Sequence, residues 1–233
     1  MAAIDQTIIQ AKVTLQDIEP PIWRRLLLLP SLNLAELHHV LQAAFGWRDE
    51  HLHEFIIGGL VYGAPELADD TATEDDPRTF EATDVRLSDF DVYHVPNPRF
   101  LYHYDFGDSW LHLIEFEPRV AKDIASKYPA CVDGARHRPP EDVGGTSGYV
   151  QFLEAWSDPA HEEHKTMRQW AGRNFHPEKF EIRSPGHRQS RQGRLAQSPR
   201  RLPFPSPVNP LNRPPQSSPT GHENCRCTTA WVT

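Results

Sequence analysis

The sequence predicts an α+β fold: a mixed or antiparallel sheet of short strands, helices packed on one side of it, and a disordered C-terminal tail. Two observations lead to this prediction. Short segments that alternate apolar and polar residues, as half-buried strands do, occur together with a few segments of helical period. From residue 183 the composition shifts to proline, serine and arginine, which bury too little apolar area to offset their ordering entropy. We therefore expect an α+β domain in residues 1–182 and a disordered tail in residues 183–233.

Two strands and a helix are predicted at the start of the domain. TIIQAKVTLQDI alternates apolar and polar residues, and EPPIWRRLLLLP is an apolar run bounded by prolines, so residues 7–30 should form two strands. The next segment, SLNLAELHHVLQAAFGW, has its apolar residues at a helical period. Asn33 is a suitable N-cap with Glu36 three residues later, and Gly46 is a suitable C-terminal stop.

Two hairpins are predicted in the middle of the domain. HLHEFIIGGLVYG should form two short strands joined at Gly58 and Gly59. Residues 64–80 are acidic and rich in turn-forming residues, so we expect an exposed loop. RFLYHYDFGDSWLHLIEFEP, residues 99–118, is the strongest hairpin, because aromatic and β-branched strands flank a Gly-Asp turn.

The last part of the domain should combine a long loop with two helices. Residues 128–148 contain many proline, glycine and charged residues, and irregular segments of this length are often functional. Apolar residues at a helical period then predict helices at about 148–156 and 161–171. The segment FHPEKFEI closes the domain.

The charge distribution limits the classes of partner. The formal net charge is −8, and the segment from residue 183 holds eight arginines against one acid, Glu223, so it carries +7 and the preceding residues carry −15. An acidic domain argues against a broad nucleic-acid surface but leaves room for a local basic groove. Arg24 and Arg25 form the one notable basic pair of the domain, and we expect both to point outward from a strand.

The sequence also bears on the compartment. It contains no run of about 18 apolar residues, so we expect no membrane span. Its N-terminus lacks the charged and apolar regions of a signal peptide. Three cysteines, Cys131, Cys225 and Cys227, do not make a disulfide framework, and a cytoplasmic location fits best.

Four ordered motifs resemble a known family. AKVTLQDIEPPIWRRLLL, LAELHHVLQAAFGWRDEHLHEF, YHYDFGDSWLH and YPACVDGARHRPPEDVGGTSGYVQFLEA are similar, in this order, to the plasmid pRiA ORF-three-like family, over about 175 residues. The resemblance implies a single cytoplasmic α+β domain of the kind carried as a passenger by insertion sequences and plasmids, and it implies no established activity. Many relatives carry a cysteine where this chain has Arg138, so a thiol pair with Cys131 is not available here.

The second hairpin gathers several polar side chains. If its turn has two residues, Gly107 and Asp108, then His103, Asp105 and His112 share one face because strand residues alternate. Two imidazoles and a carboxylate at cross-strand distance could share a metal or a proton. A solvent-facing side with a few histidines is the simpler interpretation, and both stay open.

His51 and His53 are the second candidate pair. In an extended strand both rings point to one face, which is a recurring metal-ligand spacing. Together with His103, His112 and a carboxylate they would suit a divalent ion such as zinc, provided that the two hairpins are neighbours. Two surface histidines at a strand edge are the alternative.

Glu141 and Asp142 are the third candidate pair. Prolines precede them in RPPEDVGG, and the following glycines permit unusual backbone angles. Either carboxylate could bind a metal or act as a general base. They could instead open a helix, where acids complement the helix dipole.

Two functional hypotheses follow. The first is a binding or accessory module of mobile-element origin that recognises a protein or nucleic-acid partner. The second is a metal-dependent hydrolytic enzyme in which Asp105, Glu141 and Asp142 act with the histidines, and in which the metal supplies hydroxide by lowering the pKa of a bound water. The module comes first, because no complete catalytic set can be assembled from the sequence.

Overall fold

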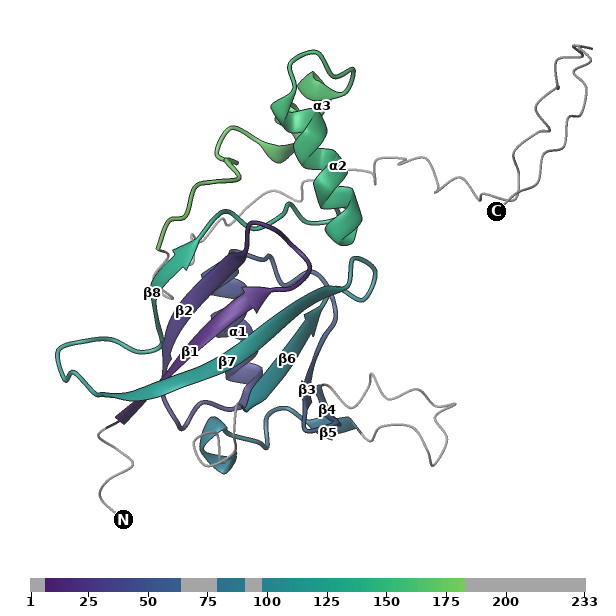
Figure 1. The fold of residues 1–233 in the computed structure, drawn as a ribbon. Coiled ribbons are helices and arrows are strands. Elements are labelled where there is room, and N and C mark those ends of the chain that lie inside the picture. The colour runs from purple at the N-terminus through teal and green to yellow at the C-terminus, as the bar shows by residue number, and fades with distance from the viewer. Residues whose placement is uncertain (1–6, 64–78, 91–97, 183–233) are drawn as a thin grey trace, which may run out of the picture. The chain divides into compact units, whose positions relative to one another are not determined.

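The computed structural model describes residues 7–63, 79–90 and 98–182 and contains one mixed sheet (Figure 1). The strand order is β5-β4-β3-β6-β7-β1-β2-β8. The strands are β1 (Thr7–Leu15), β2 (Ile22–Leu28), β3 (His53–Ile57), β4 (Leu60–Gly63), β5 (Thr79–Glu81), β6 (Arg99–Tyr104), β7 (Trp110–Ala121) and β8 (Ala130–Ala135). Only β4 and β5 pair in parallel among these strands. The predicted α+β fold is confirmed, whereas the tail and most of the predicted acidic loop lie outside the described residues.

The predicted helix is α1 (Leu34–Phe45), and it has the predicted caps. Oδ1 of Asn33 accepts a hydrogen bond from the Glu36 amide at 2.7 Å, and the Glu36 carboxylate accepts one from the Asn33 amide at 3.0 Å. Gly46 ends the helix in the left-handed region at φ 84°. Figure 1 shows α1 lying against one face of the sheet. The rings of His38 and Phe45 on α1 lie 5.9 and 4.8 Å from those of Tyr102 on β6 and His112 on β7.

The two strands predicted at the start of the domain are β1 and β2, and they pair antiparallel. Strand β2 directs its two neighbouring arginines to opposite faces of the sheet. Buried and half-buried residues alternate along β2, so consecutive side chains point to opposite faces. Arg25 points outward and its Nε lies 2.8 Å from a carboxylate oxygen of Glu117. Arg24 points inward and is only 3 % exposed. The prediction that both arginines point outward is therefore wrong for Arg24.

Arg24 ties three elements together. Its Nε donates to the carbonyl of Ala44 at the end of α1, at 3.0 Å. Its Nη1 donates to the carbonyl of Ala135 in β8, at 2.9 Å. The guanidinium also lies over the rings of Phe45 and Phe180, at 4.9 and 4.6 Å from their centroids.

Both predicted hairpins are present, but the turn of the second one differs from the prediction. Tyr104 pairs with Trp110, so five residues connect β6 and β7, and not two. An odd number of connecting residues changes which side chains share a face. His112 faces the core, whereas His103 lies half-buried on the opposite face. The predicted grouping of His103, Asp105 and His112 on one face is therefore wrong.

The segment after β7 contains more structure than predicted. Residues 128–148 include β8, which pairs with β2 at the edge of the sheet. The two predicted helices are confirmed as α2 (Gly145–Ser157) and α3 (His164–Ala171). None of the described helices is long and apolar enough to cross a membrane.

Candidate metal centre

Three carboxylates from two separate segments converge on the imidazole nitrogen of a residue in a third segment. Nε2 of His51 lies 3.5 Å from Oδ2 of Asp105, 3.6 Å from Oδ1 of Asp142 and 3.9 Å from Oε2 of Glu141. His51 precedes β3, Asp105 follows β6, and the two other acids lie between β8 and α2. All four were predicted as site residues, although the sequence placed them in different groups.

The pairing of β3 with β6 brings His51 next to Asp105. Just beyond the paired residues, the Asp105 amide donates to the carbonyl of Leu52 at 2.9 Å. Asp105 adopts a left-handed backbone conformation at φ 58°, and its Oδ1 accepts hydrogen bonds from the amides of Gly107 and Asp108. These bonds fix the carboxylate so that Oδ2 faces the imidazole.

Asp108 anchors the third segment to this turn. Its Oδ2 accepts a hydrogen bond from the Gly144 amide at 3.1 Å. A Cβ atom on Gly145 would lie 2.6 Å from the Asp108 carbonyl oxygen, so this close approach requires glycine. Both glycines have positive φ, as predicted. The first turn of α2 contains no acid, so the alternative that Glu141 and Asp142 open a helix is wrong.

One carboxylate oxygen of Glu141 accepts a hydrogen bond, whereas the other has no hydrogen-bond partner. Its side chain is 2 % exposed, and its Oε1 accepts from the Arg48 amide at 2.8 Å and lies 4.0 Å from Nη2 of Arg138. Arg138 itself lies over the ring of Trp47 and donates to the carbonyl of Gly46. Burial raises the pKa of Glu141.

The distances within the cluster resemble those between metal ligands. Nε2 of His51 and Oε2 of Glu141 are buried atoms without a hydrogen-bond partner, and such atoms cost about 1–3 kcal/mol each. An N–H···O hydrogen bond spans about 2.7–3.2 Å, whereas two ligand atoms at about 2.1 Å from one metal lie roughly 3.0–3.5 Å apart. The observed 3.5–3.9 Å is closer to the second spacing. The ligating atoms of His51, Asp105 and Asp142 all lie within 4.8 Å of one another.

An open hollow gives access to this cluster. Its volume is about 410 Å³, and it is lined by Asp49, Glu50, His51, Leu52, Asp105, Phe106 and Gly107. Two residues of the cluster therefore form part of its wall, and a small molecule in the hollow would lie beside them.

Comparison with known proteins decides the family. The family described as plasmid pRiA4b ORF-3-like protein matches residues 7–184, which include nearly the whole predicted domain. The chain belongs to the plasmid pRiA4b ORF-3-like family. The family resemblance inferred from the four motifs is thereby confirmed, and the association with mobile elements stays a prediction.

Two similar proteins come from two different organisms. The uncharacterized protein y4hQ of Sinorhizobium fredii (strain NBRC 101917 / NGR234) is 39 % identical over 166 residues, which are 71 % of this chain and 81 % of that protein. The crystal structure of MM3350, a protein of unknown function from Methanosarcina mazei Go1, is similar with a TM-score of 0.65 and 33 % identity. This match covers 76 % of this chain and 96 % of that one.

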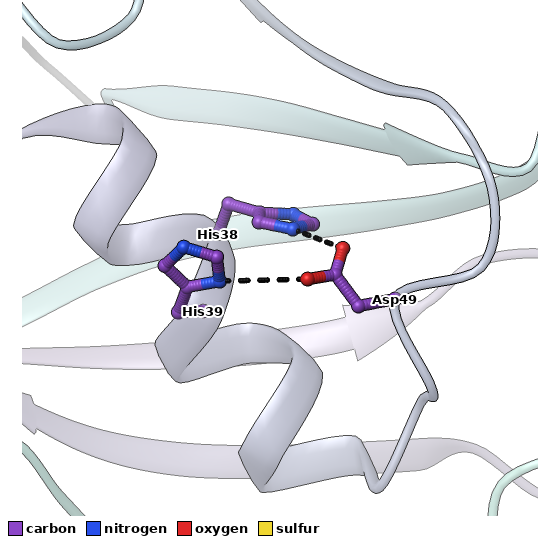
Figure 2. A group of neighbouring side chains, drawn as sticks. All are labelled: His38, His39 and Asp49. Atoms are coloured by element: carbon purple, nitrogen blue, oxygen red, sulfur yellow. Dashed lines mark hydrogen bonds and ion pairs between the residues drawn. The ribbon is translucent and has the colours of Figure 1, made fainter.

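A second cluster of this family member lies beside the hollow. Figure 2 shows two consecutive residues of α1, His38 and His39, directed toward the carboxylate of Asp49. Nε2 of His38 lies 2.7 Å from Oδ1 of Asp49, and Nδ1 of His39 lies 3.7 Å from Oδ2. The shorter distance is that of a hydrogen bond, so His38 and Asp49 already satisfy one another.

The hydrogen bond of one backbone amide determines which atoms of this second cluster carry protons. The Asp49 amide can only donate, so the atom of Gln42 that faces it at 2.9 Å is the oxygen Oε1. Nε2 of Gln42 then donates to the Tyr102 hydroxyl, which is free to donate its own proton to Nδ1 of His38. The remaining nitrogen, Nε2 of His38, donates to Asp49. Burial lowers the pKa of His38, in agreement with a neutral ring.

Two of the predicted metal ligands have other partners. The ring of His53 stacks on that of His38, with centroids 3.5 Å apart and an interplanar angle of 8°. Burial lowers the pKa of His53 to about 4. His103 lies 3.2 Å from Glu54 and 3.1 Å from the hydroxyl of Ser109. Neither imidazole belongs to the cluster around His51.

His112, the remaining predicted ligand, is part of the core. The indole of Trp47 can only donate, and it donates to Nε2 of His112 at 3.2 Å. Nδ1 of His112 therefore carries the proton and donates to the carbonyl of Trp110 at 3.1 Å. Burial lowers the pKa of this fully buried ring to about 4. Both nitrogens are occupied, so no ligand atom is left for a metal.

Sequence reasoning missed Asp49 and noticed Arg138 only as a departure from relatives. Asp49 follows the predicted helix stop by three residues, and the adjacent pair of histidines on that helix was the available signal for it. For Arg138 the signal was its position three residues before Glu141, within a segment stiffened by prolines.

Proposed function

We propose that the chain binds a divalent metal ion through His51, Asp105 and Asp142 and uses it in metal-dependent hydrolysis, with Glu141 as the general base. The carrying observation is that three carboxylate oxygens lie 3.5–3.9 Å from one buried imidazole nitrogen that has no hydrogen-bond partner. The open hollow beside the cluster supports the proposal, because a substrate needs access to the ion.

The donor set favours Zn²⁺ or Mn²⁺. Imidazole suits zinc and similar borderline ions, and carboxylates suit manganese and other hard ions. The two aspartates would neutralise the charge of the ion, and Asp105 is already oriented by its turn. Little rearrangement is needed, because the three ligand atoms already lie within 4.8 Å of one another.

Glu141 has the properties of a general base in this arrangement. A bound divalent ion lowers the pKa of a water molecule and polarises a substrate oxygen. The Arg48 amide and Arg138 hold Oε1 of Glu141, which leaves Oε2 directed toward the cluster. Oε2 has no hydrogen-bond partner, so it is the atom that would accept the proton of that water.

Metal titration by isothermal calorimetry tests the proposal. The full chain, freed of metal with a chelator, should bind about one Zn²⁺ or Mn²⁺ ion, and Asp142→Asn should weaken binding by at least about tenfold. Asp142 is partly exposed, so this change should leave the fold intact. Asp84→Asn, at another exposed position, is the matched control and should bind like the wild type. Absence of saturable binding, or equal affinities for all three proteins, would contradict the metal centre.

A nucleic-acid partner is the second candidate function, and a basic hollow favours it. This hollow, of about 440 Å³, lies next to the end of α1. Among the described residues, its basic and imidazole side chains are Arg24, His137, Arg138, Arg173, His176 and Lys179, and its one acid, Glu181, lies 2.5 Å from Nζ of Lys179. Such a local concentration of positive charge on an acidic domain can contact phosphate groups.

The salt dependence of DNA binding tests this second candidate. Arg173→Gln combined with Lys179→Gln should reduce the slope of log affinity against log salt by about 2, if both residues contact phosphates. Lys122→Gln combined with Lys127→Gln removes the same charge from an exposed loop and should leave the slope unchanged. Equal losses in both double variants would mean that only the net charge matters.

A further inference from the structure

We propose that the ligand of the acidic hollow is a small molecule in which a protonated amine is joined to an apolar group. This inference rests on the proposed metal centre, because the hollow is the access route to His51 and Asp105. It goes beyond that proposal by naming the chemical class of the substrate.

The charge of the hollow selects a cation. Besides the proposed metal ligand Asp105, two carboxylates line it, those of Asp49 and Glu50, and the described residues of its lining include no lysine or arginine. Arg48 lies outside the lining, and its guanidinium is 3.8 Å from the Glu50 carboxylate. Away from the ion, a phosphate or carboxylate group of the ligand would meet like charges on this wall, whereas a protonated amine would be attracted.

Asp49 is available to such a ligand and held in place for it. Its Oδ1 accepts the Nε2 proton of a neutral His38, whose other nitrogen is occupied by the Tyr102 hydroxyl. Its side chain is nevertheless 45 % exposed, and Oδ2 is 3.7 Å from the solvent-exposed ring of His39. A carboxylate fixed at one oxygen and open at the other can accept a charge-assisted hydrogen bond at little entropic cost.

Two apolar side chains form the other part of the wall. Leu52 is 55 % exposed and Phe106 is 42 % exposed. Both line the hollow together with the three carboxylates. An apolar group on the ligand would cover them and remove their surface from water. Acidic and apolar walls around one hollow therefore match a molecule that is cationic at one point and apolar at another.

A series of three probes tests this inference. Phenylethylamine, 2-phenylethanol and 3-phenylpropanoate share one aromatic group and differ in the charge of the second group. We expect phenylethylamine to bind the Zn²⁺-loaded full chain about tenfold more tightly than the alcohol at neutral pH, because two partly exposed carboxylates contribute. The amide resonances of Leu52 and Gly107 in two-dimensional NMR spectra report binding inside the hollow. Equal binding of amine and alcohol, stronger binding of the carboxylate, or unchanged resonances with all three probes would overturn the inference.

Charge-matched variants separate this inference from the metal centre. Asp49→Asn with Glu50→Gln should remove the preference for the amine over the alcohol. Asp84→Asn with Glu162→Gln removes the same charge at exposed positions elsewhere and should keep the preference. If the chain does not bind the metal, the proposed function fails; if the metal binds and the amine is not preferred, only this inference fails. A loss of preference in both double variants would also overturn it, since net charge would then explain the selectivity.

Discussion

At the scale of single residues, Glu141 shows that a residue of the candidate site can destabilise the folded protein. One of its oxygens is held by the Arg48 amide, and the other faces His51 without a hydrogen bond. A buried carboxylate of this kind is costly in a protein without a bound metal, because it has lost water and gained only part of its hydrogen bonds. The same incomplete bonding leaves the oxygen free to take a proton.

We expect Glu141→Gln to raise the free energy of unfolding of the metal-free protein by about 1 kcal/mol at neutral pH. The glutamine oxygen can still accept from Arg48, and its amide can donate to Nε2 of His51. Because burial raises the pKa of Glu141, the folded protein holds this proton more tightly than the unfolded chain does. The wild type therefore loses stability as the pH rises through the folded pKa, and the advantage of the variant should grow from acidic to neutral pH in chemical denaturation.

Glu141→Ala is the control for this prediction. It removes the acceptor of the Arg48 amide and leaves a cavity, so it should lower stability at every pH. Metal affinity of the glutamine variant should stay within a few-fold of the wild type, because the proposed ligands are other residues. A glutamine variant that is less stable than the wild type at neutral pH would show that the carboxylate has a partner in the metal-free protein.

At the scale of elements, one residue of the β6–β7 connection, Asp105, has two roles. Asp105 sits at φ 58°, where most residues are strained, and its Oδ1 organises the turn while its Oδ2 faces His51. Asparagine tolerates left-handed backbone and offers the same turn-forming oxygen, but it lacks the charge. The two roles can therefore be separated by substitution.

Asp105→Asn should change the melting temperature little and weaken metal binding by at least about tenfold. Asp105→Ala should lower the free energy of unfolding by roughly 1–2 kcal/mol, because alanine is strained at this backbone angle and makes no turn bonds. Thermal denaturation and metal calorimetry on both variants measure the two effects. Equal destabilisation by asparagine and alanine would show that the turn depends on the charge of Asp105.

At the scale of the whole domain, the order of the strands assembles the site. β3 and β6 are neighbours although more than forty residues separate them in the sequence, so the residues at their ends, His51 and Asp105, meet. Asp108 then fixes the segment before α2 through the Gly144 amide, which brings Glu141 to the same point. The basic hollow depends likewise on the whole domain, since Arg24 joins α1, β2 and β8.

Much of the secondary structure could be predicted, because its signals are local. The capping box of Asn33 and Glu36 and the stop at Gly46 fixed the helix correctly. The length of the β6–β7 turn was predicted wrongly, because a Gly-Asp pair favours a two-residue turn. The five-residue connection depends on the left-handed backbone and side-chain hydrogen bonds of Asp105 and on the close approach of Gly145 to Asp108. β8 was also missed, since its few β-branched residues give a weak strand pattern and its pairing with β2 defines it.

The sequence by itself determined the family and the α+β fold, and it named His51, Asp105, Glu141 and Asp142 among its candidates. Tertiary structure alone decided their grouping, because a pair such as His51 and His53 shares a face only if both residues lie in a strand. The strand begins at His53, so that ring stacks on His38, while His51 lies in the preceding bend and turns toward Asp105. The chemistry of each side chain can be read directly from the sequence, whereas the distance between two side chains depends on strand order, turn length and close packing across the fold.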